Sequence, residues 1–217
     1  MLIIIQARTN SKRFYNKIMY EIFGEPVIWW VIKSIKQVNF SKKIVVATSK
    51  NKSDEKLYRY LKGKNILVFR GSLNNVAERL NNTAEHFKSK FFIRICADSP
   101  LIDGKIVDKA ISLCKKNMKN FDIITNTFPK KTFPKGMSVE LIKASILKDN
   151  IRKMSKDEKE HVTKFFYKNF KKFKIITFKN KNKINNNQKK FSLALDNVND
   201  IQKIKKKLLK KFKIWKF

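Results

Sequence analysis

The chain opens with LIIIQARTNSKRFYNK, residues 2–17. Its first part, Leu2–Gln6, is a continuous apolar run, which is typical of a buried parallel strand. Four basic side chains follow within ten positions: Arg8, Lys12, Arg13 and Lys17. Because ligands bind beyond the carboxyl ends of the strands in open α/β sheets, the sequence predicts that this basic loop lines a binding site.

The basic loop favours a ligand that carries several phosphates. A triphosphate needs cations held close together, and arginine adds a forked donor geometry. Ala7 and Ser11 are small enough to let the backbone approach the phosphates. The loop lacks the glycines of a Walker motif, so it is not a P-loop. An exposed basic turn is the alternative interpretation.

Strand and helix patterns alternate beyond this loop. We expect strands over 43–48, 66–69, 91–96 and 121–125, and helices over 26–38, 53–62, 75–88 and 104–118. After residue 126 we expect a loop over 128–137, a short strand over 139–142, a helix from Ser155 to about 170, an exposed turn over 180–190 between two strands, the second over 191–195, and a basic helix from Asp200. The alternation predicts an α/β fold with a mostly parallel central sheet and helices on both faces. The length of 217 residues suits one domain.

The net charge of +34 raises the possibility of nucleic-acid binding. Only seven of the 51 basic residues are arginine, and lysine, asparagine, isoleucine and phenylalanine are abundant together, as codon bias in an AT-rich genome would produce. We therefore expect no nucleic-acid partner, although a basic nucleic-acid-binding module stays an alternative. The charge still favours polyanionic ligands such as nucleotides.

The apolar runs are far shorter than the roughly 20 residues of a membrane span, and no leader pattern is visible at the start. We expect no membrane association. Cys96 and Cys114 lack metal-ligand spacing, so both are interpreted as reduced core residues of a cytoplasmic protein.

Seven segments together resemble the signature of the cytidylyltransferases that activate acidic sugars. The spore-coat-polysaccharide type is the most similar branch, and octulosonate and acylneuraminate cytidylyltransferases are more distant relatives. The segments, in chain order, are IQARxxSxR (5–13), VATS (46–49), FRGS (69–72), RIxADSPLID (94–103), FPxGxxVE (133–140), EHVT (160–163) and LDxxxD (195–200). Their shared order makes the resemblance far more specific than any one segment.

The resemblance implies a Rossmann-like nucleotide-diphospho-sugar transferase fold. It also implies transfer of CMP from CTP to an acidic sugar or sugar-like acceptor, with Mg²⁺ and release of pyrophosphate, for surface polysaccharide or glycan biosynthesis. The partners are then small molecules, and residues 1–126 form the nucleotide-binding core while 127–217 form the acceptor side of a single domain, 1–217. Related enzymes are often dimers, which leaves a homodimer open.

The resemblance also assigns roles to residues. The catalytic residues expected are Arg8, Arg13, Lys17 and Asp98. The nucleotide-binding residues expected are Gln6, Ala7, Arg8, Ser11, Arg13, Lys17, Thr48, Arg70, Ser72 and Arg79. The metal ligands expected are Asp98 and Asp196, and the acceptor-binding residues expected are Glu140, Glu160 and His161.

Alternatives remain for several of these residues. Asp98 and Asp196 also suit turn or cap positions, and a histidine on a helix is more often a packed or surface residue than a catalyst. The family's usual Gly-Asp-Cys-Pro is Ala97-Asp98-Ser99-Pro100 here, and Ser138 replaces a usual aspartate, which leaves the acceptor's identity in doubt. A glycosyltransferase that uses a nucleotide sugar is a second candidate, although it would usually carry Asp-x-Asp where only Asp98 stands.

Overall fold

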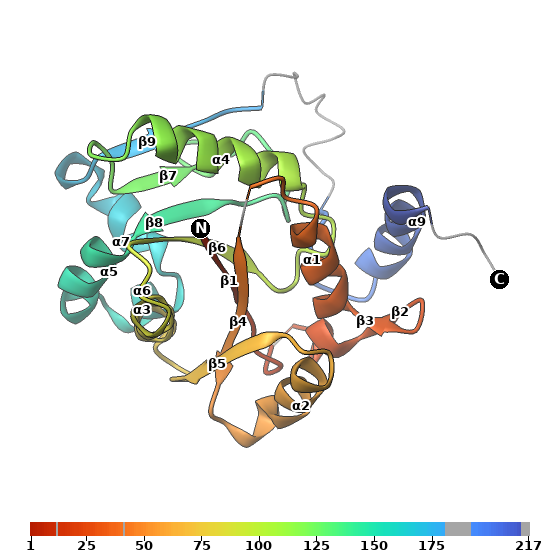
Figure 1. Ribbon diagram of the computed structural model, residues 1–217. Coiled ribbons are helices and arrows are strands. Elements are labelled where there is room, and N and C mark those ends of the chain that lie inside the picture. Colours follow the sequence, from red (N-terminus) through yellow and green to blue (C-terminus); the bar gives the residue numbers. More distant parts are fainter. Residues whose placement is uncertain (12, 41, 181–191, 214–217) are drawn as a thin grey trace.

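The computed structural model describes residues 1–11, 13–40, 42–180 and 192–213. Lys12, nearly all of the predicted turn over 180–190 and the first residue of the predicted strand over 191–195 lie outside the described residues. Within them, seven strands form one sheet in the order β5-β4-β1-β6-β8-β7-β9 (Figure 1). Their bounds are β1 Leu2–Gln6, β4 Lys43–Ser49, β5 Leu67–Gly71, β6 Phe91–Cys96, β7 Ile123–Thr125, β8 Glu140–Lys143 and β9 Ile175–Thr177.

The sheet is mostly parallel, as predicted, because β5, β4, β1 and β6 all run in one direction. Strand β8 is the exception, since it pairs antiparallel with both β6 and β7. Residues 126–139, all of which the structure describes, contain no helix to serve as a crossover, so the chain turns back into the sheet in the opposite sense. The resulting register places Arg94 directly opposite Glu140.

Helices cover both faces of the sheet, which confirms the predicted architecture (Figure 1). Side chains alternate along a strand. Ile3 and Ile5 of β1 therefore pack on one face, and Leu2 and Ile4 pack on the other. The first face carries α1 Val27–Lys36, α2 Glu55–Gly63 and α4 Gly104–Lys116, and the second carries α3 Val76–His86, α5 Ala144–Asn150 and α7 Thr163–Lys168. Burial of each such isoleucine contributes about 1.5–3 kcal/mol.

Two predictions in the second half of the chain are wrong in part. The single helix expected from Ser155 is divided into α6 Lys156–Glu160 and α7, because His161 leaves the helical conformation. The break lets Thr163 reach the carboxylate of Glu140. The strand expected over 191–195 is, in its described part, a single bridge between Ser192 and Lys135. Helix α5 was not predicted.

The last described helix, α9 Asp200–Phe212, docks beside the small hairpin of β2 Glu21–Ile22 and β3 Glu25–Pro26 (Figure 1). Its apolar residues pack against Trp30 of α1 and Leu101. Lys211 of α9 donates to the Ser34 hydroxyl at 2.9 Å and to the Ile102 carbonyl. The helix thereby braces the loop that follows β6. Among the described residues, no helix combines the length and apolar character needed to cross a bilayer.

Candidate active site

A cavity of about 600 Å³ lies at the carboxyl ends of β1 and β6. Parallel strands bring these ends to one edge of the sheet, so the loop after β1 and the loop after β6 face the same space. Eight of the predicted site residues line this cavity: Gln6, Arg8, Ser11, Arg13, Lys17, Asp98, Glu160 and His161. Asp196 is buried and is not part of the lining. The structure therefore brings Arg13 and Asp98 together, as the sequence predicted.

The buried carboxylate of Asp54 anchors the start of the basic loop. It accepts from the Thr9 amide at 2.7 Å and the Thr9 hydroxyl at 2.8 Å, and also from the amide and hydroxyl of Ser49. Burial raises the pKa of Asp54, but these hydrogen bonds lower it to a net value below its ordinary one. The sequence placed Asp54 only as an acid in the first turn of the helix expected over 53–62. Hydroxyl residues after two neighbouring strands were the one available hint of this contact.

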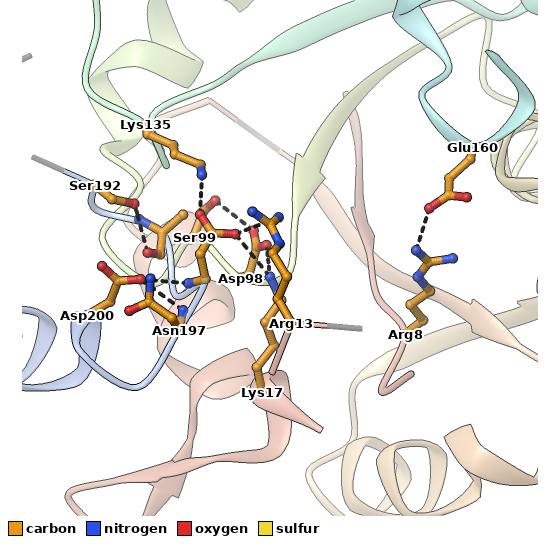
Figure 2. A network of polar contacts seen from close by, with 12 residues as sticks. Arg8, Arg13, Lys17, Asp98, Ser99, Lys135, Glu160, Ser192, Asn197 and Asp200 are labelled. Carbon is orange, nitrogen blue, oxygen red and sulfur yellow. Dashed lines mark hydrogen bonds and ion pairs between the residues drawn. The ribbon is translucent and has the colours of Figure 1, made fainter. Parts of the chain in front are cut away.

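Two carboxylates converge on one ammonium group in the cavity. The Nζ of Lys17 lies 2.5 Å from Asp98 Oδ2 and 3.6 Å from Asp196 Oδ1. Arg13 Nη2 lies 3.1 Å from the same oxygen of Asp196. Figure 2 shows Arg13, Lys17 and Asp98 gathered in one cluster, with Lys135 pointing into it. The predicted metal-ligand pair is thus assembled from residues far apart in the sequence.

Backbone hydrogen bonds fix the position of Asp196 beside Asp98. The amide of Leu195 donates to the carbonyl of Asp98 at 2.8 Å, which sets the two acidic residues side by side. The carboxylate of Asp200 accepts from the amides of Asp196 and Asn197 and so fixes the turn. Burial raises the pKa of Asp196, but Lys135, Lys17 and Arg13 lower it to a net value below its ordinary one. Asp196 is therefore held as a carboxylate.

The Asp98–Asp196 pair offers two carboxylates, a type of ligand that Mg²⁺ accepts. In the described part of the chain, no group of three or more His, Cys, Asp or Glu side chains gathers to hold a metal ion. Mg²⁺ seldom needs such a group, because one or two carboxylates with phosphate oxygens and waters complete its shell. The convergence of two carboxylates on the Lys17 ammonium marks a point where a cation is stabilised.

Arg8 points across the cavity to Glu160 (Figure 2). Its Nη2 lies 2.5 Å from Glu160 Oε1, and the two side chains are 34% and 41% exposed. This pair joins the loop after β1 to the end of α6. The phosphate role predicted for Arg8 and the acceptor role predicted for Glu160 therefore compete with a contact between the two residues.

A second cavity, of about 510 Å³, shares Arg94, Cys96 and His161 with the first. Arg94 donates to Gln6 at 2.8 Å and pairs with Glu140. Burial lowers the pKa of Arg94, but Glu140 outweighs it and the net shift is upward. Burial raises the pKa of Cys96 to about 11, so its thiol stays neutral in the shared wall.

Glu140, predicted to bind the acceptor, lies in the wall of this second cavity with its carboxylate already engaged. Besides Arg94, it accepts from the Thr163 hydroxyl at 2.7 Å and the Tyr167 hydroxyl at 3.0 Å. His161 is more open to solvent, with 62% of its side chain exposed. The geometry gives Glu140 the role of holding Arg94 in place.

The other residues predicted to bind the nucleotide are divided between two places. Arg70 and Ser72 line a third cavity of about 380 Å³, and Leu73 lines both this cavity and the first. Thr48 and Arg79 are fully buried. Burial lowers the pKa of Arg79 to about 10.

The residues predicted to bind the nucleotide also differ in whether their hydrogen-bond donors already have a partner. The Ala7 amide already donates to the carbonyl of Ala47 at 3.0 Å. The Nε and Nη2 of Arg79 have no hydrogen-bond partner among the described residues. Buried donors without a partner cost free energy, so Arg79 still has donors for a further acceptor, whereas the Ala7 amide does not.

Comparisons with known proteins agree with this site. A family model described as cytidylyltransferase matches residues 2–216. The spore coat polysaccharide biosynthesis protein SpsF of Bacillus subtilis is 28% identical over 169 residues, which cover 75% of this chain and 68% of that protein. The solved structure of a cytidylyltransferase from Leptospira borgpetersenii is 27% identical, with a TM-score of 0.87 over 97% of this chain and 94% of that chain.

A further solved structure is similar in fold alone. It is that of CMP:2-keto-3-deoxy-manno-octonic acid synthetase complexed with CTP, with a TM-score of 0.71 at 15% identity over 97% of this chain and 98% of that chain. Since the family model spans nearly the whole sequence, this chain belongs to the cytidylyltransferase family and is a nucleotidyltransferase.

Proposed function

We propose that this protein transfers CMP from CTP to an acidic sugar-type acceptor and releases pyrophosphate. The observation that carries the proposal is the convergence of Asp98 and Asp196 on Lys17, in the cavity that Arg8 and Arg13 also reach. Membership of the cytidylyltransferase family supports CTP as the donor. A cytoplasmic place in surface-glycan biosynthesis and a homodimer stay predictions.

In this proposal the basic loop binds the triphosphate. Arg8, Arg13 and Lys17 neutralise its oxygens and stabilise the charge that builds on the leaving pyrophosphate. Asp98 and Asp196 would hold Mg²⁺, which supplies Lewis-acid polarisation of a phosphate oxygen when it is bound. The cavity positions the acceptor oxygen in line with the α-phosphorus, so much of the rate comes from orientation.

We propose the second cavity as the acceptor site. Three lysines line it together with Arg94: Lys131, Lys164 and Lys168. Glu140 is the one carboxylate in the described lining, so the lining side chains favour an anionic acceptor. The shared wall of Arg94, Cys96 and His161 would bring such an acceptor next to the bound nucleotide.

We propose that the nucleotide base lies along Ser72 and Leu73, because Leu73 lines both the first and the third cavity. Arg79 is fully buried and lines neither cavity, so its role in this proposal is to hold the Ser72 carbonyl, to which its Nη1 donates. The choice of CTP among the nucleoside triphosphates is supported by membership of the cytidylyltransferase family.

The test is a pyrophosphate-release assay with each nucleoside triphosphate against acidic sugars and sugar phosphates. We expect release with CTP and Mg²⁺ when an anionic sugar is present. Asp98→Asn and Arg13→Ala should each lower turnover about 10²–10³-fold, the range for loss of one preorganised group. Release of a nucleoside diphosphate from a nucleotide sugar, without pyrophosphate from CTP, would replace this proposal with the glycosyltransferase alternative.

A further inference from the structure

Lys135 contacts Asp196, the second carboxylate proposed to hold the metal. Its Nζ pairs with Asp196 Oδ2, whereas Asp196 Oδ1 faces Arg13 at 3.1 Å and Lys17 at 3.6 Å. The two oxygens of Asp196 thus have different partners. Figure 2 shows Lys135 approaching from the segment between β7 and β8, apart from the loop that carries Arg13 and Lys17.

The backbone around Lys135 is tied to the segment that leads to Asp196. The Lys135 carbonyl accepts from the Leu193 amide at 2.7 Å, and Lys135 forms a bridge with Ser192. The next residue, Gly136, has a φ of 92°, and a Cβ on it would lie 2.5 Å from the Leu193 carbonyl carbon. These contacts fix the backbone of Lys135 beside the segment that leads to Asp196, although its side chain is 56% exposed.

We propose that Lys135 is a positioning residue that holds Asp196 Oδ2, so that Oδ1 is turned toward Asp98 and the metal. This inference rests on the proposed metal role of the Asp98–Asp196 pair. Groups that hydrogen-bond the outer atoms of metal ligands fix ligand orientation, and their loss typically lowers metal affinity about 10–100-fold. In this role Lys135 contacts the Asp196 carboxylate and does not contact the metal itself.

A competing role for Lys135 makes the opposite prediction. If its ammonium occupied the metal's own place on Asp196, removal of Lys135 would tighten metal binding, because a like charge would be gone. The geometry favours positioning, since Lys135 contacts Oδ2, whereas Lys17, which also contacts Asp98, lies at Oδ1. The two roles therefore predict opposite changes in metal affinity when Lys135 is removed: weaker binding for positioning and tighter binding for competition.

The experiment measures Mn²⁺ bound to the full chain by water-proton relaxation enhancement, with CTP present and no acceptor, so that no turnover occurs. Lys135→Met should raise the Mn²⁺ dissociation constant about 10–100-fold. Lys135→Arg, which keeps a donor to the carboxylate, should recover most of the affinity. Lys130→Met serves as the matched control, because Lys130 is an exposed lysine of the same segment.

Unchanged or tighter Mn²⁺ binding by Lys135→Met would overturn the inference. So would weaker binding that Lys135→Arg does not restore and that accompanies an equal loss of thermal stability in both variants, because Lys135 would then be a purely structural residue. Failure of the unmodified protein to bind Mn²⁺ with CTP would overturn the proposed function, and this inference with it.

Discussion

Glu160 competes with a phosphate for Arg8, because it already engages the Nη2 of that side chain. The pair is part-exposed, so it stabilises the free protein by only about 0.2–1 kcal/mol. Even so, the triphosphate must displace Glu160 before it gains Arg8. The acidic side chain thus weakens nucleotide binding by the strength of the contact that is lost.

Glu160→Gln should lower the KM for CTP, by up to about fivefold, because Arg8 is then free before the nucleotide arrives. Steady-state kinetics at saturating acceptor would measure this change. Asp157→Asn is the matched control, since Asp157 lies on the same helix but pairs with Lys164 at 2.7 Å. A higher KM for CTP in Glu160→Gln would mean that Glu160 helps the nucleotide to bind.

At this scale the sequence predicted the cations after β1 and the two acids, and the structure brings Arg13 and Lys17 together with both acids. It did not predict the partners that hold them. Lys135 is one of many lysines, and composition alone cannot single it out. Asp54 was explained as an acid in the first turn of a helix. Its contact with Thr9 could not be inferred from the sequence, because the two residues lie 45 positions apart.

Among the elements, the loop after β1 depends on one buried carboxylate. Asp54→Ala would leave the Thr9 and Ser49 donors without their acceptor, at about 1–3 kcal/mol for each donor that stays buried and unpaired. Urea unfolding at neutral pH would measure the loss.

The contribution of Asp54 should also depend on pH. Its folded pKa is lowered, so the stabilisation is present above the ordinary carboxyl value and is lost as pH falls through the lowered one. The difference between the unmodified protein and Asp54→Asn should therefore shrink below about pH 4. A difference that grows in acid would contradict this assignment.

Gly136 joins the segment before β8 to the segment before Asp196. Gly136→Ala should lower the melting temperature, because its φ of 92° and a 2.5 Å approach to Leu193 leave no room for a Cβ. A single strained backbone position costs on the order of 1–3 kcal/mol. Gly63→Ala in α2 is the control, since nothing lies within 4 Å of its added Cβ. Equal melting of the two variants would show that Gly136 is not under this constraint.

Periodicity predicted the strands and helices of the first half well, since each strand there is followed by a helix. The second half was harder for a physical reason. A strand's direction depends on whether its connection contains a helix, and short apolar runs such as the one at Glu140–Lys143 do not reveal direction. The break between α6 and α7 accompanies the hydrogen bond from Thr163 to Glu140. This is a long-range contact, and local helix propensity does not predict it.

For the whole molecule, the docking of α9 links the last described helix to the active-site edge. Burial lowers the pKa of Lys211 to about 8, against 10.5 for an ordinary lysine. Between these values the unfolded chain binds the proton and the folded protein does not, so the contribution of Lys211 to the free energy of unfolding rises with pH.

Chemical unfolding at about pH 7 and about pH 10 would measure this effect. The unmodified protein should gain stability relative to Lys211→Met as pH rises. Lys210→Met, a change at an exposed lysine of the same helix, should show no such trend. A relative loss of stability at high pH would mean that Lys211 is stabilised in its charged form.

The overall architecture was predictable because alternation along the chain is a property of the whole sequence. The division at residue 126 stays a prediction. The net charge of +34 was less informative about function than the seven ordered segments, because lysines spread over a surface do not indicate where ligands bind.

The hydrogen bond between Leu195 and Asp98 has a consequence for synthesis of the protein. One acid of the pair is translated at position 98, and the other only at position 196. A growing chain therefore carries the first acid long before the second, and the two carboxylates can meet on Lys17 only after residue 196 has been added.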